Sequence, residues 1–327
     1  MPELPEVEIT ARLISAAAAG AEVQSVRAPG LNAVRSFDPP LAALEGMRIT
    51  GIGRRGKLFM IGFADTGAAA ASQSACGPAG PQAGMAVDSG TAVESEAAVE
   101  SKAAPDAQMT LVVHLMSAGR LQLYERHATP RDRTSRVLIR LTPGERELRL
   151  REFGTKQRAW VKLVRSAALA ADDVLAVTGP EAWPDTPDGA ALRALLDQPR
   201  PLYAALRDQH VIAGIGRSWV DEILHAAQLS PFKRGSELSA AEATVLSGAV
   251  ASVLGGAIER YQRTLQLPLP DKLPLPLAVH RHNGEPCRRC GTVIEAIFFE
   301  DHVMCYCPLC QTGGKVLKDR RLSRLLK

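Results

Sequence analysis

Four cysteines near the end of the chain constrain its fold more than any other feature. Cys287 and Cys290 form one Cys-x-x-Cys pair, and Cys307 and Cys310 form a second pair sixteen residues later. Two such pairs at this spacing are typical of a four-thiolate zinc site, which leaves no position open for water. We therefore predict one structural zinc ion, bound by these four cysteines in a finger over residues 277–311.

The other two of the six cysteines are not needed for this site. Because Cys307 keeps the two-residue spacing to Cys310, we expect Cys305 to be a free thiol in a strand of the finger's hairpin. With four cysteines assigned to zinc, the sequence does not imply a disulfide framework.

The first residues of the chain suggest a reactive amine. Removal of Met1 would make Pro2 the first residue, with a secondary amine whose pKa lies far below that of lysine. Such an amine is partly unprotonated near neutral pH and can attack a sugar carbon, and Glu3 beside it can move protons during that reaction. The alternative is structural, because proline and glutamate in a first turn favour a helix start.

Residues 2–8 read Pro-Glu-Leu-Pro-Glu-Val-Glu. This start, followed by the cysteine pairs at the other end, resembles the formamidopyrimidine-DNA glycosylase and endonuclease VIII family, whose members remove oxidised bases from DNA and then nick the strand. The resemblance and the sequence pattern predict an α+β multidomain protein. Its parts are an N-terminal catalytic two-sheet β-sandwich with a flanking helix over 2–165, a helix–two-turn–helix domain over 166–265, the β-hairpin zinc finger and a basic extension over 312–327.

Hydrophobic periodicity gives the elements of these parts. Short alternating runs at 47–53 and 58–63 predict a β-hairpin with Arg54 to Lys57 at its turn. Residues 185–264 are predicted to be mainly helical, and the prolines of 267–276 predict a stiff connector to the finger. Further expected elements are a helix over 6–19 and strands over 110–124, 136–142, 146–153 and 159–164.

Three interior residues match family positions in the sandwich. The resemblance implies that Lys57 acts at the catalytic centre by contacting the DNA backbone beside the lesion, and that His114 contacts a phosphate. Met116 corresponds to a methionine that fills the space left by the flipped base, although it stands one place earlier than in the family pattern.

The segment Arg151-Glu152-Phe153-Gly resembles the family's Arg-Arg-Phe-Gly. The resemblance implies that Arg151 faces the orphaned base and that Phe153 wedges between neighbouring base pairs. Glu152 replaces the second arginine, which removes one phosphate partner.

A glycine-rich turn precedes a predicted helix at Gly214-Ile-Gly216-Arg217. Such a turn presents backbone N–H groups and the positive end of a helix dipole to a phosphate. The segment resembles the hinge of the family's helix–two-turn–helix module, in which asparagine occupies the position of Arg217. A longer cation still suits phosphate.

The charge of the chain is unevenly distributed. Residues 64–108, rich in Ala, Gly and Ser, contain six acidic residues and one lysine, so the total of +4 leaves about +9 on the rest of the chain. This insert cannot build a core, and we expect a disordered spacer or an acidic mimic of DNA. In the C-terminal tail, 315–327, six basic residues accompany one aspartate and a partly apolar face. The tail is either a second DNA contact or a docked helix.

Other patterns set the protein's expected surroundings. No apolar run appears long enough to cross a membrane, and the first turn is acidic, unlike a signal peptide. We expect a cytoplasmic, nucleoid-associated monomer whose partner is double-stranded DNA with damaged bases or abasic sites.

The predicted function is that of a DNA repair glycosylase with AP lyase activity. An alternative is a DNA-binding protein of the same fold with weak or no catalysis, because the departures at Glu152, Arg217, Met116 and Asp301-His302 affect DNA-contacting positions; at the last, relatives usually carry a phosphate-binding arginine. A zinc-ribbon RNA protein would explain only the finger. The loop that covers 8-oxoguanine is missing before the finger, so oxidised pyrimidines and abasic sites are candidate substrates beside oxidised purines.

Overall fold

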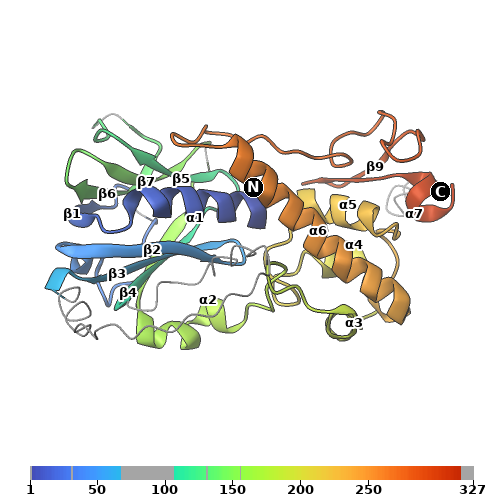
Figure 1. Ribbon diagram of the computed structural model, residues 1–327, viewed down its shortest axis with the longest axis horizontal. Helices are drawn as coiled ribbons and strands as arrows, with labels where there is room; N and C mark the ends of the chain where they lie inside the picture. The colour runs from blue at the N-terminus through green and yellow to red at the C-terminus, as the bar shows by residue number, and fades with distance from the viewer. Residues whose placement is uncertain (1, 31, 68–106, 130–131, 155, 318–327) are drawn as a thin grey trace, which may run out of the picture.

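The computed structural model describes the chain over residues 2–30, 32–67, 107–129, 132–154 and 156–317. A β-rich half carrying helix α1 lies beside a helical half, and the finger lies at the far end of the helical half (Figure 1). Most of the predicted insert, with Cys76, and most of the basic tail lie outside the described residues.

The β-rich half is a sheet that folds over on itself into two layers. Strand β1 pairs with β2 at Glu22 and Arg48, and this pairing joins the layer β5-β7-β6-β1 to the layer β2-β3-β4-β8. Apolar side chains of both layers meet in one core, which confirms the predicted two-sheet sandwich. The strands are β1 (Glu22–Arg27), β2 (Met47–Arg55), β3 (Leu58–Asp65), β4 (Met109–His114), β5 (Gly119–Tyr124), β6 (Ser135–Thr142), β7 (Glu147–Glu152) and β8 (Trp160–Arg165).

Two details of the sandwich test the predicted strands. The hairpin turn falls at Gly56 and Lys57, as predicted, and Gly56 has a φ of +55°. The single strand expected over 110–124 is wrong, because β4 ends at His114 and β5 begins at Gly119. A Cβ at Gly119 would lie 2.3 Å from the carbonyl oxygen of Leu115, so the chain makes a tight turn there that apolar alternation does not reveal.

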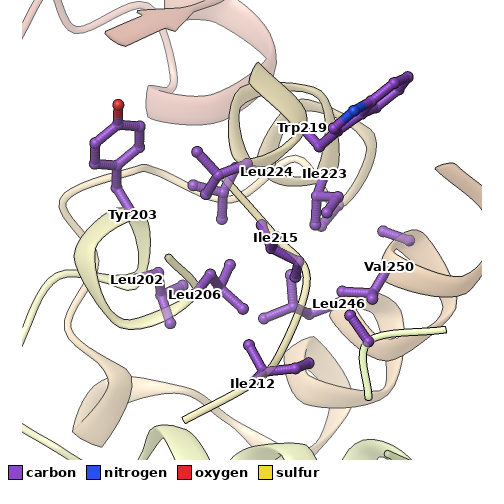
Figure 2. Close-up of a cluster of buried hydrophobic side chains, with 14 of the residues drawn as sticks. Leu202, Tyr203, Leu206, Ile212, Ile215, Trp219, Ile223, Leu224, Leu246 and Val250 are labelled. Atoms are coloured by element: carbon purple, nitrogen blue, oxygen red, sulfur yellow. The ribbon is translucent and has the colours of Figure 1, made fainter. Parts of the chain in front are cut away.

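Helices form the other half around a second apolar core, part of which is shown in Figure 2. Met304 and Tyr306 of the finger belong to this core, so the finger packs directly on the helices. The helices are α2 (Asp173–Ala176), α3 (Gly189–Leu196), α4 (Leu202–Ala205), α5 (Arg217–Ala226) and α6 (Ala240–Thr264). Short 3-10 helices η1 (Leu41–Leu44), η3 (Ser166–Ala171) and η4 (Gly235–Glu237) accompany them, and the finger contains β9 (Glu295–Phe298), β10 (Val303–Tyr306) and α7 (Pro308–Thr312).

Helix α6 corrects the expectation about apolar runs. It contains an 18-residue window with a mean hydropathy of 1.5, so by length and composition it is apolar enough to cross a membrane. Ser239 and Glu242 form a capping box at its start, and Leu246, Val250 and Leu254 are buried in the helical core. In this fold the apolar residues of α6 therefore pack in the core of the helical half.

Helix α1 (Leu4–Ala18) connects the two cores. Leu4 belongs to the helical core, whereas Val7, Ala11 and Ile14 belong to the core of the sandwich. The helix lies along the sheet, and its N-terminal end points at α6 (Figure 1). The first residues are thereby held at the boundary between the two halves.

Buried ion pairs hold the β2–β3 hairpin against the helical half. The guanidinium of Arg54 lies 2.6 Å from the Glu8 carboxylate and also pairs with Glu181. The second Glu181 oxygen accepts from Arg55 and from the backbone N–H of Gly56, each at 2.7 Å. Because the Arg54 and Glu8 side chains are almost wholly buried, neither charge has water as an alternative partner.

We predict that Arg54→Met lowers the free energy of unfolding by about 3 kcal/mol, because Glu8 and Glu181 lose the buried cation that they share and keep only the partly exposed Arg12 and Arg55. Urea denaturation at constant pH measures the loss. The matched control is Arg165→Met, whose pair with Asp38 is exposed on both sides and should change stability by no more than about 1 kcal/mol. Equal losses in the two variants would contradict this account.

Candidate active site at the boundary of the two halves

The side chain of Glu3 caps a helix that belongs to the other half of the molecule. Its Oε1 accepts from the backbone N–H of Ser218 at 2.9 Å, and its Oε2 accepts from that of Trp219 at 3.4 Å. Both donors lie in the first turn of α5, where the helix dipole stabilises an anion. Glu3 is only 2% exposed, and Pro2 beside it is partly exposed.

The glycine turn before α5 is shaped to receive these first residues. A Cβ at Gly216 would lie 2.2 Å from Cδ of Glu3, and one at Gly214, where φ is +104°, would lie 2.4 Å from Cδ1 of Leu4. The N–H of Gly214 donates to Gln209 Oε1 at 2.9 Å. The glycines and the N–H groups that we assigned to phosphate from the sequence therefore contact protein groups in this structure.

Glu6 lies at the centre of the same boundary and was not predicted from the sequence. Its carboxyl group accepts from the N–H of Glu3 at 2.9 Å, from Tyr261 Oη at 3.0 Å and from Trp219 Nε1 at 3.1 Å. Burial and the charge of Glu3 raise the pKa of Glu6 from 4.5 to about 7, against the effect of these donors. The only sequence signal for Glu6 is its position in the first turn of a helix.

We predict that this raised pKa makes stability depend on pH. Between pH 4.5 and about 7 the folded protein binds more protons at Glu6 than the unfolded chain does, so stability falls as pH rises through this window. Above pH 7 the loss should approach about 3 kcal/mol relative to low pH. Urea denaturation from pH 5 to 8 should show a weaker fall in Glu6→Gln than in the wild type. Identical pH profiles would refute the assignment.

A cavity of about 140 Å³ opens beside Pro2. Glu6, Leu115 and Leu121 line it, and so do five residues of the segment 269–275, here called the closing segment. The closing segment is anchored to strand β5. Gln122 Nε2 donates to the Leu269 carbonyl oxygen and to Asp271 Oδ1, both at 3.1 Å, and Arg120 donates to the Asp271 carbonyl oxygen.

Lys57 and His114 lie next to each other at the end of the hairpin, since His114 pairs with Leu58 across β3 and β4. Burial lowers the pKa of the Lys57 amine, against the attraction of Glu3. Burial, with the charges of Lys57 and Arg35, lowers the pKa of His114 to about 4, so its imidazole is neutral at pH 7. His114 Nδ1 accepts from the N–H of Met116 at 2.9 Å, which leaves the proton on Nε2.

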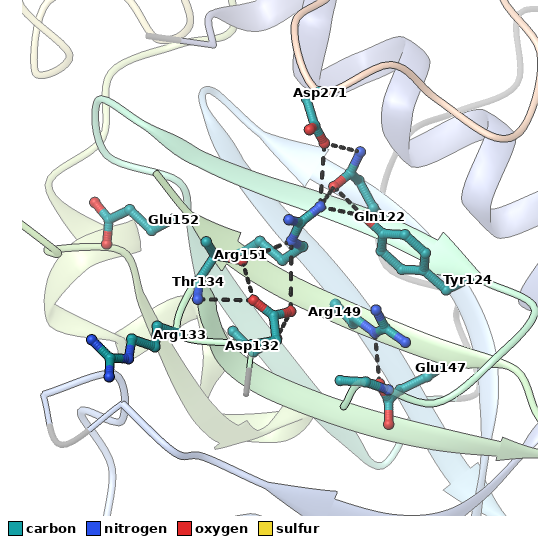
Figure 3. A network of polar contacts seen from close by, with 12 residues as sticks. Gln122, Tyr124, Asp132, Arg133, Thr134, Glu147, Arg149, Arg151, Glu152 and Asp271 are labelled. Carbon is teal, nitrogen blue, oxygen red and sulfur yellow. Dashed lines mark hydrogen bonds and ion pairs between the residues drawn. The ribbon is translucent and has the colours of Figure 1, made fainter. Parts of the chain in front are cut away.

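Arg151, which we predicted to face the orphaned base, lies on strand β7 of the sandwich, in the polar network of Figure 3. Arg151 donates to Thr134 Oγ1 at 2.9 Å and lies 3.3 Å from Asp271 of the closing segment. Its guanidinium lies 4.7 Å from the ring centre of Phe153. Glu152 is buried and accepts from the N–H of Ala159 at 2.7 Å, so it serves the interior of the sandwich.

Arg217 contacts the finger. It occupies the first position of α5, donates to the Asp301 carbonyl oxygen at 2.7 Å and pairs with the Asp301 carboxylate. Its charge is therefore paired within the protein, whereas we predicted from the sequence that it contacts a phosphate.

The cysteines of the two pairs gather at one point. The Sγ of Cys290 lies 3.4 Å from those of Cys307 and Cys310. The donor atoms of Cys287, Cys307, Cys310 and His225 all lie within 4.8 Å of one another. Four sulfurs placed tetrahedrally about 2.3 Å from a zinc ion lie about 3.7 Å from one another. The spacing of these cysteine sulfurs therefore fits a zinc ion. His225, from α5, was missed because it lies far from the cysteines in the sequence.

Cys305 lies apart from this donor set. It is buried in β10, as predicted, and its sulfur accepts from the N–H of Arg281 at 3.3 Å.

The fold combines a β-sandwich, a helical unit with a glycine hinge and a cysteine finger, and the three parts meet around Pro2 and Glu3. This is the architecture of the helix–two-turn–helix DNA glycosylases. Residues 1–156 match the formamidopyrimidine-DNA glycosylase N-terminal domain, and residues 179–268 match the formamidopyrimidine-DNA glycosylase H2TH domain. The chain belongs to the formamidopyrimidine-DNA glycosylase family.

Two relatives and one solved structure illustrate the similarity. An uncharacterised formamidopyrimidine-DNA glycosylase-like protein of Mycobacterium tuberculosis is 43% identical over 38% of this chain and 80% of its own length. The formamidopyrimidine-DNA glycosylase of Herpetosiphon aurantiacus is 33% identical over 63% of this chain and 76% of its own. The Lactococcus lactis enzyme, bound to DNA containing N7-benzyl-Fapy-dG, has a TM-score of 0.73 and 22% identity over 95% of this chain and 100% of its own.

Proposed function

We propose that this protein is a DNA glycosylase with AP lyase activity, and that the amine of Pro2 is its nucleophile. The observation that carries the proposal is that Pro2 lines a cavity and stands next to a carboxylate held on a helix N-terminus. Family membership supports DNA as the substrate, and a relative from L. lactis has been solved bound to DNA containing an abasic site. The predicted division of the chain into catalytic sandwich, helical domain and finger is part of this proposal.

The chemistry begins with a nucleotide flipped out of the duplex, because C1′ of the sugar cannot be reached in the stack. The nitrogen of Pro2 attacks C1′, and the bond from C1′ to the base breaks. The base leaves with the electron pair of that bond and takes up a proton. The proton that the Pro2 nitrogen gives up reaches the ring oxygen through Glu3 as the bond from C1′ to that oxygen breaks and the sugar opens to an iminium. Loss of a proton from C2′ then allows elimination, in which the bond from C3′ to the phosphate oxygen breaks and the phosphate leaves with the electron pair.

The surrounding residues support these steps. The cavity between Glu6, Leu121 and the closing segment would hold the base while water is excluded. Lys57 in its protonated form, and the neutral His114 through its Nε2–H, would contact the backbone on either side of the sugar. Arg151 and Phe153 would fill the vacated stack after Arg151 releases Asp271.

A DNA-binding protein without catalysis remains a second candidate. The ion pair of Arg151 with Asp271 favours it, because an Arg151 held by the closing segment does not fill the space left by a flipped base, as base excision would require. The nucleophile test distinguishes the two candidates.

Borohydride reduction of an iminium fixes the protein to DNA covalently, so trapping on a duplex with an abasic site tests the proposal directly. The protein with a free Pro2 amine should be trapped, whereas a form with an N-terminal extension should not, because the nitrogen is then an amide. Glu3→Gln should lose base excision but keep much of the lyase activity on a preformed abasic site. Glu259→Gln, on the exposed side of α6, is the matched control. Full trapping by the extended form would remove Pro2 from the mechanism. A panel of defined lesions would then identify the excised base.

We further propose that Cys287, Cys290, Cys307 and Cys310 hold one zinc ion, which when bound organises the finger. We predict one equivalent of zinc in the wild type and its loss from Cys290→Ser, whereas Cys305→Ser and His225→Phe should keep it. We expect this result because Cys290 shares a Cys-x-x-Cys pair with Cys287, whereas His225 has to reach the zinc ion from helix α5. Such a thiolate pair binds zinc more strongly than the histidine does. Metal analysis and cobalt spectra of the three variants decide this. Zinc retained by Cys290→Ser and lost from His225→Phe would assign the fourth position to His225.

A further inference from the structure

A basic residue that no sequence motif identified is tied to the glycine turn of the candidate active site, because Gln209 Nε2 donates to the carbonyl oxygens of Arg207 and Ile215, both at 2.9 Å. Arg207 follows helix α4, and its guanidinium lies 4.9 Å from the ring centre of Tyr203. Tyr203 extends from the helical core (Figure 2), and its ring stacks with His302 of the finger at a centroid distance of 5.9 Å. Arg207 therefore lies where the helical half meets the finger hairpin.

The charge of Arg207 reaches the residues assigned to chemistry. It contributes to lowering the pKa of the Lys57 amine, on the hairpin of the sandwich. The attraction of Glu3 for Lys57 is larger than the repulsion from Arg207. Arg207 itself has no carboxylate partner, because none of the ion pairs among the described residues includes it. By contrast, Asp301 neutralises Arg217, and Asp271 and Asp132 neutralise Arg151.

The finger orients this free guanidinium. His302 Nδ1 lies 2.6 Å from Asp301 Oδ1, so in the tautomer that donates to Asp301, Nε2 accepts from Arg207 Nη1 at 3.3 Å. The His302 ring stacks on the Phe299 ring, with the ring centroids 4.5 Å apart and an angle of 7° between the planes. It also stacks on the ring of Tyr203 in α4. One N–H of the guanidinium is thus used for positioning, and the others are available.

We propose that Arg207 binds a backbone phosphate of the substrate DNA beside the flipped nucleotide, together with Lys57. In this arrangement Asp301 and His302 of the finger position Arg207 and do not themselves contact the phosphate. A planar guanidinium can donate two parallel hydrogen bonds to one phosphate, which a partly fixed arginine does at less entropic cost. This proposal depends on the proposed function in one respect, namely that DNA is the ligand bound at this site.

The test is the salt dependence of binding to a duplex with an abasic site. Each phosphate contact contributes about 0.9 to the slope of log K against log salt concentration. Arg207→Gln should reduce the slope by about 0.9, and Arg207→Lys should retain it because the charge remains. Arg200→Gln removes the same charge from a nearby arginine already paired with Asp208, and it should change the slope much less.

A purely structural role for Arg207 predicts other results. A structural role would lower the zinc content or the melting temperature of Arg207→Gln, whereas a phosphate-binding role leaves both unchanged. Adding His302→Arg to Arg207→Gln should restore the slope by placing a cation at the same boundary. An unchanged slope in Arg207→Gln, or an equal fall in Arg200→Gln, would overturn the proposal. If the wild type binds DNA but is not trapped, the proposed catalysis fails while the slopes still test Arg207.

Discussion

The carboxylate of Glu3 at the N-terminus of α5 is the contact on which the arrangement of the site depends. It satisfies two N–H groups of a helix that follows it by more than two hundred residues in the chain, and it fixes the direction of the residue before it. Gly216 makes this approach possible, because any side chain there would overlap the Glu3 carboxyl group. The nucleophile proposed here is therefore placed by the helical half and not by the sandwich to which its own helix is attached.

Polar contacts at three separate boundaries meet around this point. Arg54 joins the hairpin to Glu181, Asp271 joins the closing segment to β5, and Asp301 joins the finger to α5. Each boundary positions a different group, namely the hairpin turn that carries Lys57, the wall of the cavity beside Pro2 and, through His302, the guanidinium of Arg207. Most of these pairs are partly exposed, so they mainly fix the relative positions of the parts that they join and add little to the free energy of unfolding. The buried Arg54–Glu8 pair contributes to both.

The parts of the fold with a local signature were predictable from the sequence. The Cys-x-x-Cys pairs, the hairpin turn at Lys57 and the glycine hinge at Gly214 are encoded within a few residues. Glu6, Arg207 and Asp271 have no such signature, since their roles arise from partners more than ninety residues away. The strand expected over 110–124 failed for a related reason: the turn before Gly119 lies within a run that alternates like a single strand.

The pairing of β3 with β4 has a consequence for how this chain can change. Lys57 and His114 lie at one end of the pair, whereas Asp65 and Met109, which flank the long connection, lie at the other. Strands of this length separate their ends by roughly 20 Å. Segments can thus be exchanged or lengthened between Asp65 and Met109 without changing the register of either strand or the surroundings of Pro2. The connection is a natural position for fusing a reporter or a second module to the protein.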